Sequence, residues 1–233
     1  PIGYEDPCEA VNIAIDDVLV KRQEESRVPG QRRTGHKRKY AHNTIARFSH
    51  NGKKYVLNGA SITSLLPVIM SFLFANGLSG KRYQFFTDGH TALNTAIMNF
   101  YSWKGNMGII LDWYHLGKKC GELLSQSMNG RKLRNEVLNK LKPLLWYGLT
   151  DKAIEFLREI PEKDIKNVQL SEKLIAYLER NRPYIPCYAA RKELGLCNSS
   201  AVGEKANDLI VSERQKHNGM SWSKEGSVAL ASI

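Results

Sequence analysis

The pattern that most constrains this fold is a change of secondary-structure signal about halfway along the 233-residue chain. Before residue 116, short segments rich in β-branched and aromatic residues alternate with helical patterns. From Leu116 to about Arg182, the sequence is rich in Leu and Lys, has helical periodicity and carries few strand signals. Such a chain requires a sheet-based domain together with a separate block of helices.

The first half predicts a mixed sheet. Residues 11–23, "VNIAIDDVLVKRQ", form a first strand, and "NTIARFSHNGKKYVLNG" predicts a hairpin that turns at Asn51-Gly52. An apolar helix over residues 61–76 would begin at the cap residue Ser61, although Pro67 falls inside it. "RYQFFTDG", "HTALNTAIMNFYSW" and "MGIILDWYH" then predict a strand, a helix and a strand. This order indicates an α/β fold with helices on both faces of the sheet.

We expect three regions along the chain. Residues 1–115 form the first part of the core, and residues 116–182 form a helical insertion of three to five helices. Residues 183–233 complete the core with a final helix from about residue 201 to residue 217, which ends before an Asn-Gly turn.

The charge of the chain favours a polyanionic partner. It contains 34 Lys and Arg against 23 Asp and Glu, a net charge of +11, which favours nucleic acid first and an anionic membrane surface second. A basic segment and the final helix concentrate this charge, and we expect phosphate contacts there, although such runs are also typical of solvated loops. The predicted DNA-binding residues are Arg27, Arg32, Arg33, Lys37, Arg38, Lys39, Arg214 and Lys216.

Cysteine spacing and hydropathy bear on the compartment. The four cysteines have no CxxC spacing, which argues against a zinc ribbon or a disulfide framework and favours a reducing compartment. The longest apolar run, Ile62 to Phe74, is interrupted and too short to cross a bilayer. The N-terminus lacks the basic and apolar regions of a signal peptide. It also lacks an initiator Met, so we expect a fragment or a processed product.

Three acidic residues stand where a sheet would bring them together. Asp16 lies in the first strand, Asp88 follows "RYQFF", and Glu204 begins the final helix. Carboxylates are the ligands that Mg²⁺ prefers, and two such ions about 3.5–4 Å apart cleave phosphodiesters. Each acid also has an ordinary interpretation: a sheet-edge charge, a residue of an Asp-Gly turn, and a charge at a helix start.

The motifs as a set resemble a known family. "FFTDGHTALNTAI", "IILDWYHL" and "GEKANDLIVSERQKHNGMSWS", in this order, resemble the DDE transposases of bacterial insertion sequences, nearest the group that shares its catalytic core with Mutator-like elements. The resemblance spans the whole chain and is most specific from Gln84 to Trp222. It implies an RNase H-like mixed sheet flanked by helices, with an all-helical insertion before the last catalytic helix.

The resemblance assigns the catalytic acids. Asp16, Asp88 and Glu204 would be the catalytic residues and would hold two Mg²⁺ or Mn²⁺ ions. Asp17 is an alternative first acid, since the family usually has Gly at that position. Asp208 lies one helical turn beyond Glu204 and is an alternative third acid.

The family's Asp/Cys-x-x-His signature matches Asp112 and His115 in "DWYH". We expect both residues to orient the metal ligands without binding the metal themselves. The alternatives are a structural histidine, and a zinc site shared by His115 and Cys120 that lacks further ligands. Trp222, which follows the final helix, would pack under it or stack on a base, and packing is favoured.

The resemblance implies the catalytic domain of a DNA transposase, which performs metal-dependent strand cleavage and strand transfer. Its partners would be the element's ends and target DNA, on which the chain would form a homo-oligomer. Its place would be the bacterial cytoplasm, at the nucleoid and not at a membrane. One alternative is an RNase H-like nuclease without strand transfer. Another is a domesticated DNA-binding protein without catalysis.

Overall fold

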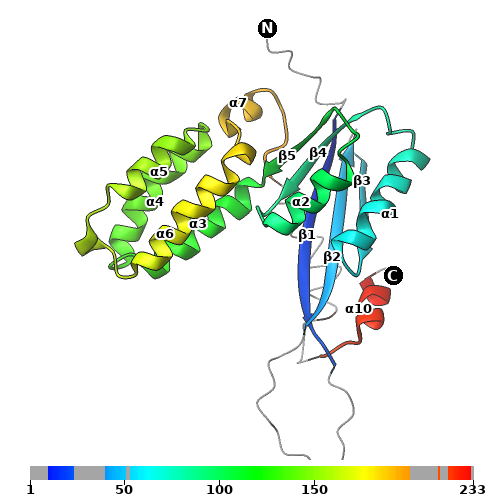
Figure 1. Ribbon diagram of the computed structural model, residues 1–233, viewed down its shortest axis with the longest axis horizontal. Helices are drawn as coiled ribbons and strands as arrows, with labels where there is room; N and C mark the ends of the chain where they lie inside the picture. Colours follow the sequence, from blue (N-terminus) through cyan, green and yellow to red (C-terminus); the bar gives the residue numbers. More distant parts are fainter. Residues whose placement is uncertain (1–9, 24–39, 51–52, 200–214, 216–219, 232–233) are drawn as a thin grey trace, which may run out of the picture. The chain divides into compact units, whose positions relative to one another are not determined.

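The computed structural model describes residues 10–23, 40–50, 53–199, 215 and 220–231, and Figure 1 follows them along the chain. Its strands are β1 (Ala10–Lys21), β2 (Tyr40–His50), β3 (Lys53–Gly59), β4 (Arg82–Thr87) and β5 (Met107–Leu111). Its α-helices are α1 (Ile62–Ala75), α2 (Thr91–Phe100), α3 (Trp113–Ser127), α4 (Arg131–Trp146), α5 (Thr150–Arg158), α6 (Val168–Asn181), α7 (Tyr188–Glu193) and α10 (Lys224–Ala231). Short 3₁₀ turns span Glu162–Asp164 and Arg182–Tyr184.

The strands form one mixed sheet in the order β3-β2-β1-β4-β5. β2 is antiparallel to both β1 and β3. β4 and β5 run parallel. The start of β4 pairs with the start of β5, since Tyr83 N donates to Asn106 O, and the two ends also pair, since Asp112 N donates to Thr87 O. The predicted α/β class is confirmed, and the arrangement is consistent with an RNase H-like sheet.

The predicted hairpin is present as β2 and β3. His50 pairs with Lys53 and Thr44 pairs with Gly59, which leaves a two-residue connection at residues 51–52. The connecting residues themselves lie outside the described part of the chain.

Contacts divide the chain into two compact units. The unit with α3 to α7, called the helical unit below, comprises Pro1–Pro7, Gln84–Asn94 and Gly108–Ser200. The unit with β1 to β3, called the hairpin unit below, comprises Cys8–Tyr83, Thr95–Met107 and Ala201–Ile233.

In the hairpin unit, α1 and α10 cover opposite faces of β2. The ring of Phe72 on α1 lies 4.8 Å from the ring of Phe48. On α10, the Oγ atom of Ser227 accepts a hydrogen bond of 2.6 Å from Nδ2 of Asn43. Residues 43 and 48 are an odd number apart on one strand, so their side chains point to opposite faces. These are called the α1 face and the α10 face below.

The start of α1 confirms the predicted cap. The Ser61 hydroxyl accepts from the Ser64 N–H, and the Ser64 hydroxyl accepts from the Ser61 N–H, each at 3.2 Å, which completes a capping box. Pro67 lies inside the helix, which continues to Ala75.

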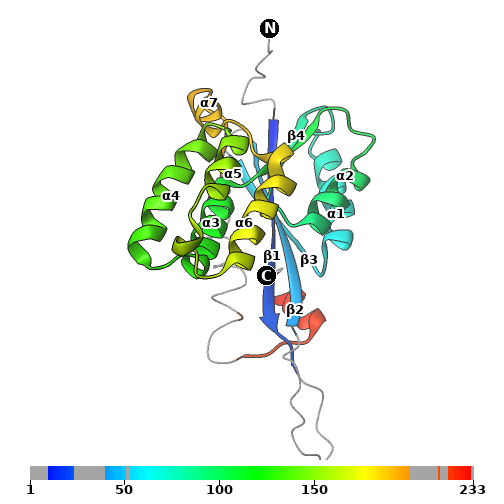
Figure 2. The same cartoon turned by 60° about the vertical axis from the view of Figure 1, so that its left-hand side comes forward.

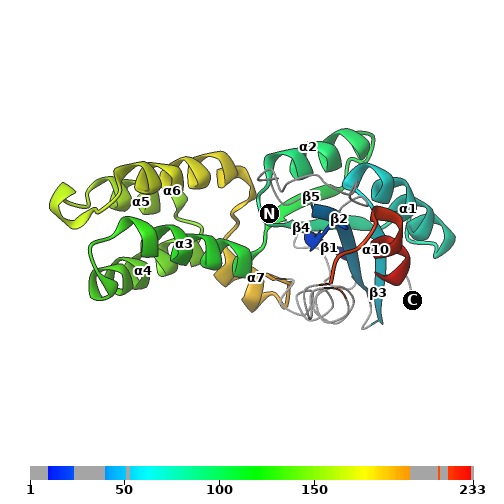
Figure 3. The same cartoon turned by 90° about the horizontal axis from the view of Figure 1, so that it is seen from below.

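The helical unit is built on four helices in a closed ring of contacts, in which α3 packs on α4, α4 on α5, α5 on α6, and α6 on α3. Figures 2 and 3 show α3 and α4 side by side, with α5 and α6 as a second pair. Helical structure begins at Trp113, three residues before the predicted start of the insertion. No described helix has the length and apolarity that a bilayer crossing needs.

Candidate catalytic site

Strand β1 changes its buried face at the two candidate first acids. Ile15 is buried on the α1 face, whereas Val18, an odd number of positions further, is buried on the α10 face. The pairing with β2 continues without a bulge through this point. On the α10 face, Val18 belongs to a buried cluster against which Trp222 packs. Asp16 lies on the α10 face and Asp17 on the α1 face.

The two acids have different surroundings. Asp16 is half-buried opposite Ile45 of β2, and its Oδ1 atom accepts from the N–H of Asp17 at 2.9 Å. Asp17 is exposed, and its Oδ1 atom accepts from the hydroxyl of Thr44, the residue opposite it, at 2.6 Å. Asp17 therefore has a structural partner on its own face of the sheet.

The end of the predicted final helix reaches the α10 face. Trp222 packs against the buried side chains of Val18, Val20 and Ile45, so the described contacts place it on the sheet, whereas packing under the final helix was predicted. The indole N–H of Trp222 donates to the carbonyl of Gln215 at 3.1 Å. The buried Gln215 side chain in turn donates to the Ser227 carbonyl at 2.7 Å. Asp16 therefore shares a face of the sheet with the described end of this segment.

Asp88 directly follows β4 and forms the predicted Asp-Gly turn. Its Oδ1 atom accepts from the N–H of His90 at 2.8 Å, the pattern of an Asx turn. Gly89 has φ of +81°, a conformation that favours glycine. Asp88 is half-buried. A carboxylate has about four acceptor positions, of which this bond uses one.

Helix α6 packs directly on this turn. The hydroxyl of Tyr177 donates to the main-chain carbonyl of Asp88 at 3.0 Å. A Cβ atom at Gly89 would lie 2.8 Å from Oδ1 of Asn181 and 2.8 Å from Cδ1 of Leu111. Sequence reasoning missed Tyr177 and Asn181, because their helical spacing is equally typical of ordinary core residues.

Asp112 caps α3 at the end of β5. It is fully buried, and its Oδ1 atom accepts from the N–H of Tyr114 at 2.8 Å and from the hydroxyl of Ser199 at 3.0 Å. The main-chain N–H of Asp112 donates to the carbonyl of Thr87, the residue before Asp88, at 2.9 Å. Asp112 therefore joins the ends of β4 and β5 to the start of the insertion.

Arg191 of α7 fixes the segment that leads toward Glu204. Its guanidinium donates to Oε1 of Gln84 in β4 at 3.0 Å and to the carbonyl of Cys197 at 2.7 Å. It also donates to Oδ1 of Asn198 at 3.1 Å, while the Asn198 carbonyl accepts from Trp113 N. No sequence motif marks Arg191, because its role arises from contacts between distant segments.

His115 and Cys120 lie along α3. The N–H of His115 donates weakly to Asp112 Oδ1, at 3.4 Å, and its half-buried ring meets the ring of Tyr114 edge-on. Burial raises the pKa of the Cys120 thiol to about 12, so this thiol is protonated near neutral pH.

The described residues contain no group of three or more His, Cys, Asp or Glu side chains that would hold a metal ion. Asp16 belongs to the hairpin unit and Asp88 to the helical unit. Both supply carboxylate oxygens, a donor chemistry that fits Mg²⁺ or Mn²⁺. The remaining predicted site residues lie outside the described part of the chain; they are Glu204, Asp208, Arg27, Arg32, Arg33, Lys37, Arg38, Lys39, Arg214 and Lys216.

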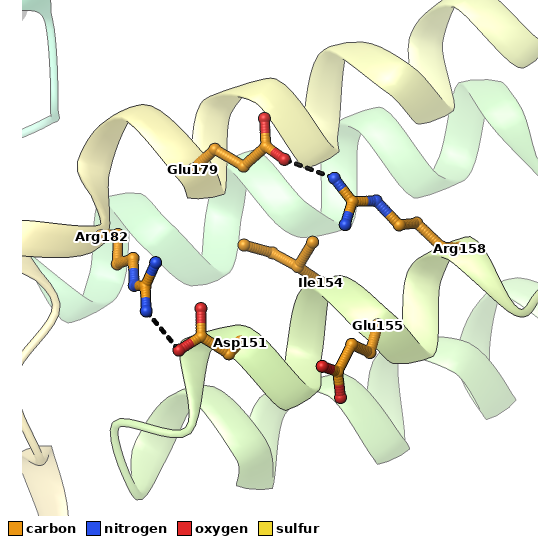
Figure 4. A pocket seen from close by; sticks show the side chains of 6 residues that line it. All are labelled: Asp151, Ile154, Glu155, Arg158, Glu179 and Arg182. Atoms are coloured by element: carbon orange, nitrogen blue, oxygen red, sulfur yellow. Dashed lines mark hydrogen bonds and ion pairs between the residues drawn. The ribbon is translucent and has the colours of Figure 1, made fainter.

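A shallow pocket between α5 and α6 is lined mainly by charged side chains of both signs (Figure 4). Arg158 pairs with Glu179 at 2.6 Å, and Arg182 pairs with Asp151 at 2.5 Å. The four side chains are 48–59% exposed, so each pair contributes little to stability. Both arginines have carboxylate partners, which disfavours the pocket as an anion site.

Comparison of the sequence with protein-family models gives no match, and comparison with curated proteins gives no significant match. Among solved structures, the fold is similar to one of the Drosophila P element transposase strand transfer complex. The TM-score is 0.43 and the sequence identity 10%, and the match covers 99% of this chain and 77% of that chain.

Proposed function

We propose that this chain is the catalytic domain of a DDE transposase related to those of bacterial insertion sequences. One observation carries the proposal: the motif positions that the structure describes lie in or directly after the strands that the sequence predicted for them. Asp16 lies within β1, Asp88 directly follows β4, and Asp112 directly follows β5. The helices α3 to α6 then occupy the place of the insertion.

In this proposal, Asp16, Asp88 and Glu204 hold two divalent ions. When bound, the ions would activate a water and stabilise the leaving oxygen in phosphodiester cleavage, and would then stabilise the attack of a DNA 3′-hydroxyl on target DNA. Asp16 is favoured over Asp17 because it shares the α10 face with Trp222, which follows the segment that contains Glu204. Asp17 instead accepts from Thr44 on the other face.

Asp112 acts through other residues in this proposal. Its carboxylate caps α3 and accepts from Ser199, so it orders both the end of β5 and the start of the segment that leads toward Glu204. His115 stands one turn into the same helix as an orienting partner.

The partners would be DNA ends and target DNA, held through phosphate contacts by the basic segment from Arg27 to Lys39 and by the cations near Arg214. The chain would act as a homo-oligomer assembled on DNA, at the nucleoid of a bacterial cell.

The test compares charge-neutral variants of the acids with matched neighbours. Nicking of supercoiled DNA and strand transfer from a 3′-hydroxyl oligonucleotide are measured with Mn²⁺. Glu204→Gln, Asp88→Asn and Asp16→Asn are each expected to reduce both reactions by several orders of magnitude, because each removes a ligand charge. Asp208→Asn and Asp17→Asn, the matched controls, are expected to retain most activity.

Each other outcome points to a different function. Nicking without strand transfer would identify a nuclease, and DNA binding without metal-dependent chemistry would identify a non-catalytic binding protein. Loss of activity in Asp208→Asn, with activity retained in Glu204→Gln, would move the third acid to residue 208.

A further inference from the structure

The Asp88 turn is held by contacts on three sides, all within the helical unit. The Asp88 side chain accepts from the N–H of His90 at 2.8 Å, and the carbonyl of Thr87 before it accepts from Asp112 N at 2.9 Å. The third contact comes from α6, where the hydroxyl of Tyr177 donates to the Asp88 carbonyl at 3.0 Å. The first two contacts are local or come from the adjacent strand end. Tyr177 comes from the helical insertion.

The chemistry of the Tyr177 contact suits a positioning role. Tyr177 is only 6% exposed, so packing holds its ring and hydroxyl in place. The hydroxyl donates to the main-chain carbonyl and not to the carboxylate, so it orients the Asp88 peptide while using none of the acceptor positions of the side chain.

Asn181, one turn further along α6, supports the same turn. Its Nδ2 atom donates to the carbonyl of Tyr177 at 3.0 Å, which fixes the amide in a buried position. The space beside Gly89 is so narrow that a Cβ atom there would contact both Asn181 and Leu111 at 2.8 Å. The Asp88-Gly89 peptide therefore lies between α6 and the end of β5.

We propose that Tyr177, backed by Asn181, is a positioning residue that sets the orientation of the Asp88 carboxylate. This role rests on the proposed function, in which Asp88 is a metal ligand. It gives the helical insertion a direct part in building the catalytic site, since α6 supplies the contact. The misplacement of one ligand weakens metal binding without removing any ligand charge.

The test is Tyr177→Phe in the full chain, which removes one oxygen atom and keeps the ring. In the metal-free protein, we expect hydrogen exchange of the peptide over residues 85–94 to accelerate about three- to tenfold, the scale of one lost hydrogen bond. Binding of Mn²⁺, followed by calorimetry, is expected to weaken by a similar factor. Higher Mn²⁺ is expected to restore cleavage, which a loss of folded protein would not allow.

Tyr147→Phe is the matched control, because Tyr147 lies in the same unit and is 59% exposed. This variant is expected to match the wild type in all three measurements. Unchanged exchange over residues 85–94 in Tyr177→Phe would overturn the proposal. Equal acceleration across all of α3 to α6 would also overturn it, because that result describes a general structural role.

Two further variants separate the possible failures. If Tyr177→Phe does not fold, Asn181→Ala tests the same support from the next turn of α6, with the same local acceleration expected. Asp88→Asn tests the proposed function itself. If Asp88→Asn binds Mn²⁺ and cleaves DNA like the wild type, the metal role of Asp88 fails, whatever exchange shows for Tyr177.

Discussion

At the scale of single residues, adjacent acids on a strand are not equivalent. Asp16 and Asp17 have the same chemistry, yet alternation of side chains places them on opposite faces of the sheet. Asp17 meets Thr44, whereas Asp16 lies on the face that Trp222 covers. Burial along β1 shifts face between these two residues, so hydrophobic alternation alone does not identify which of them would be the proposed catalytic acid.

Gly89 offers a stability test of the Asp88 turn. Gly89→Ala is expected to lower the free energy of unfolding by about 2–4 kcal/mol, because a Cβ atom adds overpacking to the strain of a positive φ. Gly77→Ala is the control, since Gly77 has φ of +68° with nothing within 4 Å of its Cβ position. It is expected to cost about 1–2 kcal/mol, the backbone strain alone. Denaturant unfolding measures the free energy of unfolding of both variants. Equal losses would show that Asn181 moves aside from the new Cβ atom without a cost in stability.

At the scale of elements, α3 begins where the signature Asp112 stands. The same carboxylate caps the helix and accepts from Ser199, so the motif residue has a structural task independent of any metal. This task explains why the helical run starts at Trp113 and not further along the chain.

Asp112→Ala is expected to lower the free energy of unfolding by about 2–3 kcal/mol, because it removes the cap and leaves the part-buried donors Tyr114 N–H and Ser199 hydroxyl without this acceptor. Asp112→Asn keeps an acceptor oxygen and is expected to cost less than about 1 kcal/mol. Thermal and denaturant unfolding check both values. If Asp112→Asn keeps its stability but loses cleavage entirely, the negative charge of Asp112 is needed for catalysis and the capping role is incomplete.

At the scale of the whole molecule, the net charge of +11 would govern the proposed association with DNA. Such charge acts over long range and is screened by salt, so it appears in the salt dependence of binding and not in the fold. The basic segment carries six of the 34 Lys and Arg residues.

Replacement of Arg32, Arg33, Lys37 and Arg38 with Ala is expected to flatten the plot of log binding constant against log salt, by about 0.9 for each lost phosphate contact. The control replaces four exposed lysines of the helical unit and removes the same charge; they are Lys152, Lys163, Lys166 and Lys173. Fluorescence anisotropy over a salt series measures both proteins. Equal flattening in the two would mean that net charge alone drives binding.

The local elements of this protein followed from its sequence. The strand β1, the two-residue hairpin connection, the cap at Ser61 and the Asp-Gly turn after β4 depend on neighbouring residues, so short patterns predict them. The mixed α/β class and the helical insertion followed from the order of those elements. The joint metal site of Asp16, Asp88 and Glu204 stays a prediction.

Only the tertiary structure decided which distant groups meet. The contact of Tyr177 with Asp88 joins residues 89 positions apart, and that of Ser199 with Asp112 joins residues 87 positions apart. No local pattern distinguishes a buried tyrosine that donates to a turn from one that only fills space. The hydrogen-bond partners of such buried side chains depend on how the helices pack. Hydrophobic burial is non-directional, so only the complete fold determines which polar groups come within hydrogen-bonding distance.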